Sequence, residues 1–141
     1  MRNLPVEVLS WQEFFQARTE IAAVYLFGSF GTEFEHPQSD IDLGIVFTRS
    51  VTLQEELELD AALSLYVSHD RIDLINLNRA PIALQFRALK EGVLVYEGDY
   101  YKHSDFIEYV IKTYPDYAVK YVRFARDYEQ ALKEEYNSHG G

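Results

Sequence analysis

One continuous apolar run constrains the fold of this chain more than any other feature of its sequence. Residues 21–27 are all apolar, include several β-branched and aromatic side chains, and end at Gly28. A strand with one face in water alternates apolar and polar residues, whereas a strand buried on both faces is apolar throughout. We therefore predict that residues 21–27 form a strand with both faces buried.

The remaining elements follow from helical periodicity, capping residues and chain breakers. We predict helices over 6–18, 52–66 and 81–90, strands over 40–47, 71–77 and 93–96, a loop over 28–39, and a mostly helical tail over 105–136 with a break at Pro115. Strands that alternate with helices indicate an α/β fold. We expect a small mixed sheet of about four strands, with helices packed on one side and a C-terminal helical segment bracing it.

The length and composition favour one globular domain. The chain has 141 residues, of which 48% are hydrophobic, and a chain of this size is suited to a single core. We expect one domain over residues 1–141, with its core over about 20–98 and the C-terminal helical segment over about 104–136.

Charge, cysteine content and hydropathy exclude several classes of protein. A net charge of −10 argues against direct nucleic-acid binding, because such binding depends on Lys and Arg neutralising phosphates. The absence of cysteine excludes disulfides and thiolate metal sites. No run approaches the roughly 18 apolar residues of a membrane helix, and no hydrophobic signal segment opens the chain, so we expect a cytoplasmic protein without membrane contact.

The histidines show no ligand spacing, and we expect all of them at the surface or in loops: His36, His69, His103 and His139.

Three aspartates fall on two of the predicted strands. Asp40 and Asp42 are separated by one residue at the start of a strand, so both side chains project from the same face. Asp73 lies on a later strand, after a helix. If the two strands are neighbours, the three carboxylates lie within several ångströms of one another.

Such a cluster needs a cation. At about 5 Å and an effective dielectric constant near 20, each pair of charged carboxylates costs about 3 kcal/mol. Hard oxygen ligands favour Mg²⁺, which also binds the oxygens of a triphosphate. We predict that Asp40, Asp42 and Asp73 are catalytic and bind two Mg²⁺ ions, an arrangement that supports in-line nucleotidyl transfer.

A Gly-Ser pair precedes these aspartates and suits a nucleotide. Gly28 follows the buried strand and lets a phosphate approach the backbone closely, while Ser29 offers a hydroxyl and a backbone N–H. Gly28 and Ser29 are therefore our predicted nucleotide-binding residues, and a Mg²⁺-bound nucleoside triphosphate is the expected ligand.

The order of these motifs resembles a known superfamily. Gly28-Ser29, ten residues, Asp40-x-Asp42 and then Asp73 are similar to the pattern of the polymerase-beta-like nucleotidyltransferases. The strand over 71–77, the Ala80-Pro81 helix start and residues 92–97 resemble more narrowly the minimal nucleotidyltransferase (MNT) antitoxins of HEPN/MNT toxin–antitoxin pairs. The resemblance spans about residues 20–136.

The resemblance implies a function and a partner. Such antitoxins pair with a helical HEPN-domain ribonuclease toxin and transfer AMP from ATP to a tyrosine of that toxin, which silences it. The chain would then be a protein adenylyltransferase that forms a homo-oligomer or a hetero-oligomer with the toxin. It departs from the family in having Gly31, Thr32 and Glu33 where a small-Arg-Gly run is frequent, which leaves Arg49, Arg79 or Arg87 to neutralise the triphosphate beside Mg²⁺.

Two other functions fit the same residues. One is an antitoxin that masks its toxin by binding alone, and the other is a nucleotidyltransferase for a small molecule such as an aminoglycoside. The tyrosine-rich tail is compatible with partner binding, but aromatic residues at helical spacing usually pack onto their own sheet. We therefore expect the following tail residues to pack in the core: Phe106, Val110, Tyr117, Tyr121 and Phe124.

Overall fold

The computed structural model describes residues 10–27, 41–67 and 72–140, with the side chains at 121–122 and 136–140 left out of that description. The elements are α2 (Gln12–Gln16), β1 (Ile21–Phe27), β2 (Ile41–Phe47), α3 (Leu53–Val67), β3 (Ile72–Asn76), α4 (Ile82–Glu91), β4 (Val93–Glu97) and α5 (Tyr100–Gly140). Helices and strands occur where the sequence predicts them, within a few residues. The predicted 28–39 loop and the start of the predicted 6–18 helix lie outside the described residues.

The four strands form one mixed sheet in the order β3-β2-β1-β4. β1 is antiparallel to both β2 and β4, whereas β2 and β3 are parallel. β1 therefore occupies an interior position, and all seven of its residues are buried, as its apolar sequence predicts. The parallel pair is the feature that positions the aspartates.

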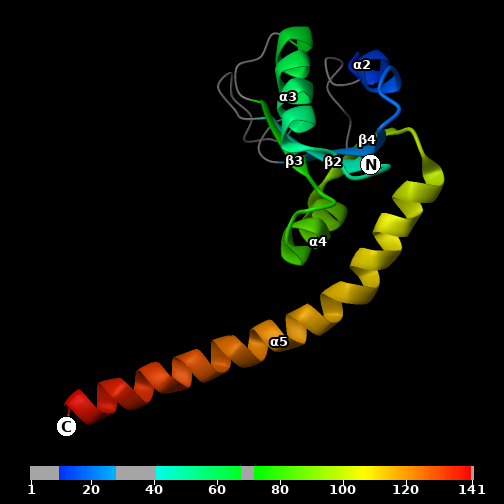
Figure 1. Ribbon diagram of the computed structural model, residues 1–141. Helices are drawn as coiled ribbons and strands as arrows, with labels where there is room; N and C mark the ends of the chain where they lie inside the picture. Colours follow the sequence, from blue (N-terminus) through cyan, green and yellow to red (C-terminus); the bar gives the residue numbers. More distant parts are fainter. Residues whose placement is uncertain (1–9, 28–40, 68–71, 141) are drawn as a thin grey trace.

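Helices cover both faces of this sheet, so the prediction that they pack on one side is wrong (Figure 1). Because β1 and β2 are apolar on both faces, each face needs its own covering layer. One core cluster lies under α2 and α3 and includes Trp11, Phe15, Leu59, Leu63 and Ile45. The other lies under α4 and the first turns of α5 and includes Tyr25, Phe27, Leu77, Ala88, Phe106 and Val110.

A reciprocal cap begins α3. The Glu55 backbone N–H donates to the Thr52 hydroxyl at 3.1 Å, and the Thr52 backbone N–H donates to the Glu55 carboxylate at 3.1 Å. This pairing satisfies two backbone donors that the first turn of a helix leaves without helical partners. Arg49 binds the same carboxylate at 2.8 Å. The predicted helix start at Thr52 is confirmed by this cap.

The C-terminal tail is a single helix, α5, with Pro115 inside it. The predicted break at Pro115 is therefore wrong, although α5 curves along its length and its C-terminal half projects away from the sheet (Figure 1). Phe106 and Val110 are buried as expected, but Tyr117 and Phe124 are exposed, contrary to the predicted core packing. The Tyr121 side chain lies outside the description. Among the described residues no helix is long and apolar enough to span a bilayer.

Candidate active site at one end of the sheet

Asp42 and Asp73 lie side by side at one end of the sheet. The parallel pairing of β2 with β3 aligns Asp42 with Asp73, and each is the second residue of its strand. Because side chains alternate between faces and neighbouring strands are about 4.8 Å apart, the two carboxylates project from the same face as close neighbours. Asp42 is partly buried, whereas Asp73 on the edge strand is exposed. The structure thus brings together two of the three predicted metal ligands.

The third aspartate, Asp40, lies outside the described residues, as do the predicted nucleotide-binding residues Gly28 and Ser29. Phe27, the last described residue before Gly28, shows where the Gly-Ser pair begins. Phe27, which ends β1, is the pairing partner of Asp42. The predicted Gly-Ser pair therefore follows directly on a residue that is one strand spacing from Asp42 and two from Asp73.

A glycine behind Asp42 allows close packing of the strands. Gly44 lies on the same face as Asp42, two residues along β2. A Cβ at this position would lie 2.7 Å from Leu77 Cδ1 and 3.0 Å from Phe27 Cε1. Only a residue without a side chain leaves room for these two neighbours. Packing of Phe27 and Leu77 over Gly44 gives the aspartate pair an apolar, tightly packed neighbour on the sheet.

Asp60, on α3, is a nearby carboxylate that the sequence analysis missed. Burial raises the pKa of Asp60, the negative charge of Asp73 raises it further, and a hydrogen bond from Ser64 opposes both effects. Asp60 also lines a cavity of about 230 Å³ between α3 and the β2–β3 edge of the sheet, together with Glu56, Leu74 and other residues. Helical periodicity gives no signal for this proximity, because it depends on where α3 crosses the sheet.

Three or more potential metal ligands do not come together anywhere in the described residues. The histidines add none. His103 was expected at the surface, but it is buried at 3% exposure, and that prediction is wrong. Its Nε2 is hydrogen-bonded to the Tyr25 hydroxyl and its Nδ1 to the Glu97 carboxylate. Because α5 begins beside β4, the imidazole is enclosed between β1, β4 and α5 and joins the three elements.

The arginines proposed for the triphosphate are all ion-paired. Arg49 binds Glu55 at 2.8 Å, Arg79 binds Glu56, and Arg87 binds Glu91 at 3.1 Å. Arg49 and Arg79 follow the C-terminal ends of β2 and β3, whereas the aspartates lie near the N-terminal ends. At about 3.3 Å per residue, the strands place Phe47 roughly 17 Å from Asp42 and Asn76 roughly 10 Å from Asp73.

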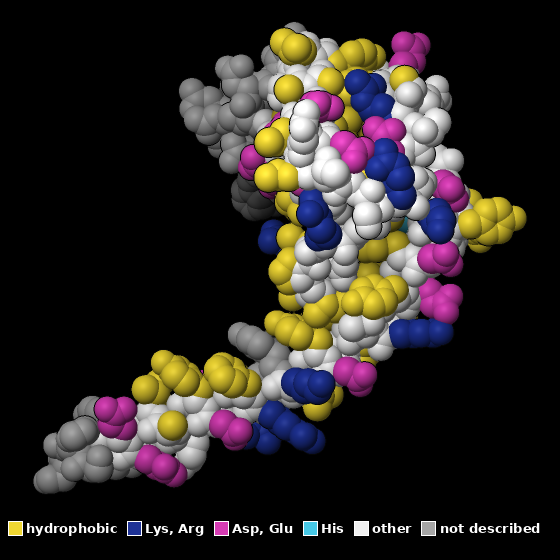
Figure 2. All heavy atoms as spheres, viewed as in Figure 1, with side chains coloured by type: hydrophobic (Ala, Val, Ile, Leu, Met, Phe, Trp, Pro, Cys, Tyr) yellow, Lys and Arg dark blue, Asp and Glu magenta, His cyan; other side chains and the backbone are white. Residues whose placement is uncertain are grey.

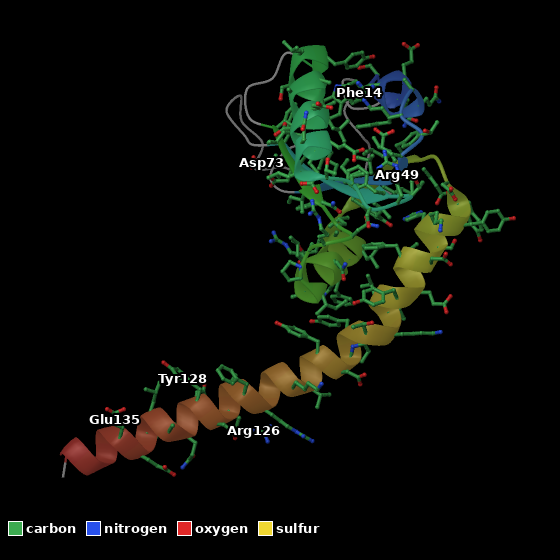
Figure 3. The ribbon with its side chains drawn as sticks, in the orientation of Figure 1. Phe14, Arg49, Asp73, Arg126, Tyr128 and Glu135 are labelled. Carbon is green, nitrogen blue, oxygen red and sulfur yellow. The ribbon has the colours of Figure 1, made fainter. Side chains whose placement is uncertain are left out.

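Figure 3 shows Asp73 and Arg49 at opposite ends of the sheet. Arg49 and Arg79 therefore lie beyond the end of the sheet that is opposite the aspartate pair, and their contact with a triphosphate stays a prediction. Arg87 differs, because it lies on α4, whose C-terminal end leads into Val93, and Val93 pairs with Leu26 at the same end as the aspartates. Its ion pair with Glu91 is exposed, and exposed pairs of this kind contribute little to stability.

The sequence matches the family model for Polymerase beta, Nucleotidyltransferase over residues 10–101. This match covers the whole sheet and both described aspartates. The chain belongs to this nucleotidyltransferase family, as the Gly-Ser and aspartate motifs predicted. A comparison with curated proteins gave no significant match.

Solved structures from toxin–antitoxin systems share the fold. A chain of a toxin–antitoxin with AMP-PNP superposes with a TM-score of 0.71 at 20% identity, covering 87% of this chain and 98% of that one. A chain from tri-AMPylated Shewanella oneidensis HEPN toxin in complex with MNT antitoxin gives 0.68 at 18% identity, with 88% and 97% covered. A chain of the toxin–antitoxin MntA-HepT gives 0.68 at 18% identity, also with 88% and 97% covered. The similarity extends along nearly the full length of these chains.

Proposed function

We propose that this protein is an MNT antitoxin that transfers AMP from ATP to a tyrosine of a cognate HEPN toxin. Membership of the nucleotidyltransferase family supports the reaction class. The similarity in fold to chains from toxin–antitoxin complexes, one of them a tri-AMPylated HEPN toxin with MNT antitoxin, supports the partner and the acceptor. The alignment of Asp42 with Asp73 on parallel strands is the observation on which the catalytic proposal depends.

The aspartate pair fits Mg²⁺. Two carboxylates at one strand spacing repel each other, by up to about 3 kcal/mol before solvent screening, and a divalent cation relieves this repulsion. Both offer hard oxygen donors, which Mg²⁺ prefers to nitrogen or sulfur. Asp40 is the further ligand in our proposal, since it precedes Asp42 by two residues. Bound Mg²⁺ would supply positive charge to the triphosphate and to the leaving pyrophosphate.

The proposed reaction joins the tyrosine oxygen to the α-phosphorus of ATP. The bond between the α-phosphorus and the bridging oxygen of the β-phosphate breaks, and pyrophosphate leaves. The tyrosine hydroxyl must lose its proton, and Asp73 is our candidate to accept it. Asp73 is exposed on an edge strand, so a residue of another protein can reach it, whereas Asp42 is more deeply placed. Gly28 and Ser29 are proposed to hold the triphosphate.

The proposal is tested by label transfer. The purified protein is incubated with ATP labelled at the α-phosphate, Mg²⁺ and the helical protein encoded beside it, and label is followed on the helical protein. We expect labelling by the wild type and at least a hundredfold less with Asp42→Asn or Asp73→Asn, since each removes a charged ligand. Asp105→Asn is the matched control, because Asp105 is exposed on α5 and lies beside Thr48, at the opposite end of the sheet.

Toxin activity, measured in the same reactions, distinguishes catalysis from masking. If AMP transfer silences the toxin, inhibition requires ATP and fails in the aspartate variants. Full inhibition without ATP and without label on the toxin would contradict the proposal, because it would mean that binding alone is sufficient. Label on a small-molecule acceptor but not on the toxin would also contradict it.

A further inference from the structure

The projecting half of α5 has an apolar stripe on one side. The stripe consists of Tyr117, Phe124, Tyr128 and Leu132, which follow one another at intervals of four or seven residues and therefore lie on the same helix face. Phe124 is 68% exposed and Tyr128 is 58% exposed. Their rings stack on each other with centroids 6.3 Å apart. Figure 2 shows hydrophobic side chains along one edge of this part of the helix.

The projecting half of α5 exposes large apolar side chains and packs against no other element of the described fold. A helix is stabilised in water mainly by packing an apolar face against another element, and helices without such packing are marginal. The sheet and the other helices lie along the first part of α5, and the C-terminal part extends beyond them (Figure 1). A continuous helix with an exposed aromatic stripe indicates a surface that another helix covers.

The charges beside the stripe are divided into two segments. Residues 118–126 contain Lys120, Arg123 and Arg126 and no acidic residue. Residues 127–135 contain one base, Lys133, and four acids: Asp127, Glu129, Glu134 and Glu135. In Figure 3 Arg126 projects from a different side of the helix than Tyr128, whereas Glu135 lies on the side of Tyr128, beyond Leu132 at the C-terminal end of the stripe.

This division of charge is self-complementary in one direction only. Two copies of the helix in parallel would place basic against basic and acidic against acidic. Two antiparallel copies place the basic segment of each against the acidic segment of the other, and charged residues that flank an apolar seam are what set helix orientation. The stripe lies across the boundary between the two segments, so an antiparallel arrangement also aligns the two stripes.

We propose that the stripe is the interface for a second copy of this chain, with the two α5 helices antiparallel around a two-fold axis. The arrangement is closed, because the same surface of both copies is used. Phe124 and Tyr128 lie near the axis and form the apolar centre. Lys120 and Arg123 of each copy lie opposite the acidic segment of the other. This inference does not depend on the proposed transferase activity.

The test is a charge exchange measured by sedimentation or by light scattering after size exclusion. The wild-type chain is expected to be dimeric in the micromolar range and to dissociate more readily in high salt. Lys120→Glu/Arg123→Glu and Glu129→Lys/Glu134→Lys are each expected to be monomeric, because both segments then carry one sign. An equimolar mixture of the two variants is expected to form the heterodimer.

Two further variants complete the design. Phe124→Ser/Tyr128→Ser is expected to remove association in every combination, whereas Lys102→Glu, at the other end of α5, leaves the dimer intact. Near-ultraviolet circular dichroism verifies that the sheet and its core remain folded in each variant. A wild-type chain that is monomeric across this concentration range, or two charge variants that fail to pair, would overturn the proposal. Stripe variants that lose only toxin binding would assign this face to the toxin instead.

Discussion

Asp42 and Asp73 are aligned residue for residue on two adjacent parallel strands, although a whole helix separates them in the sequence. Parallel strands require such a crossover, and here α3 provides it. The alignment places two acidic side chains on one face at one strand spacing. It also means that a shift of β3 by one residue would turn Asp73 to the other face of the sheet.

Nucleotide binding is expected to depend on both aspartates. Ligand at about 100 times its dissociation constant stabilises a protein by about 2.7 kcal/mol, which raises the melting temperature by several degrees. We expect Mg²⁺ with a non-hydrolysable ATP analogue to produce this increase in the wild type and little increase in Asp42→Asn or Asp73→Asn. Differential scanning fluorimetry provides the measurement, with Asp105→Asn as the control. An equal increase in Asp73→Asn would show that this carboxylate does not hold the metal.

Gly44→Ala is expected to destabilise the fold by about 1 to 3 kcal/mol, the usual cost of overpacking a core. The added methyl group would lie 2.7 Å from Leu77 Cδ1. Leu77→Ala creates space on that side, so the double variant is expected to be more stable than the sum of the single effects predicts. Urea unfolding of the four proteins measures the coupling. Additive effects would show that crowding against Leu77 is not what destabilises Gly44→Ala.

Stability is expected to fall in alkali through Tyr25. Burial, and secondarily the charge of Glu97, raises the pKa of Tyr25 from 10.0 to about 12. The folded state therefore retains the phenolic proton between these values while the unfolded state loses it, so the free energy of unfolding decreases as the pH rises. The loss is about 2 to 3 kcal/mol at 1.36 kcal/mol per pKa unit. Stability measured from pH 9 to 12 is expected to show this extra decrease in the wild type and not in Tyr25→Phe.

Asp60→Asn is expected to stabilise the protein slightly at neutral pH. The pKa of Asp60 is raised, first by burial and then by Asp73, so its charged form is disfavoured in the folded state. This penalty is present above the raised folded pKa and is lost as the pH falls through it towards the unfolded value. Because the side chain is partly exposed, the gain is less than about 1 kcal/mol.

Unfolding curves of wild type and Asp60→Asn at several pH values test this expectation. The difference is expected to shrink in acid, where Asp60 is protonated in both states. A variant less stable than wild type at neutral pH would mean that the hydrogen bond with Ser64 outweighs the penalty.

Much of the site follows from local pattern. The apolar run at 21–27 predicts a doubly buried strand, and alternation along β2 predicts the face of Asp42 relative to its apolar neighbours. Thr52 and Glu55 predict the start of α3, since a capping box involves only residues three apart. These features depend on neighbours in the sequence, so the chain encodes them directly.

Other features depend on how the elements pack. Sequence alone did not reveal that helices cover both faces, that His103 is enclosed between β1, β4 and α5, or that Asp60 lies near Asp73. That Arg49 and Arg79 both follow the opposite end of the sheet from the aspartates became clear only once β2 and β3 were known to run parallel. Helical periodicity also could not distinguish Val110, which packs under the sheet, from Phe124, which projects into solvent.

The sequence by itself therefore determined which residues are acidic, which segments form strands and helices, and to which family the motifs belong. Only the tertiary structure decided the register that joins Asp42 to Asp73 and the point at which α5 leaves the core. Periodicity describes the faces of a single element over a few residues. Register and helix docking depend on contacts between segments far apart in the chain, whose free energies no local pattern specifies.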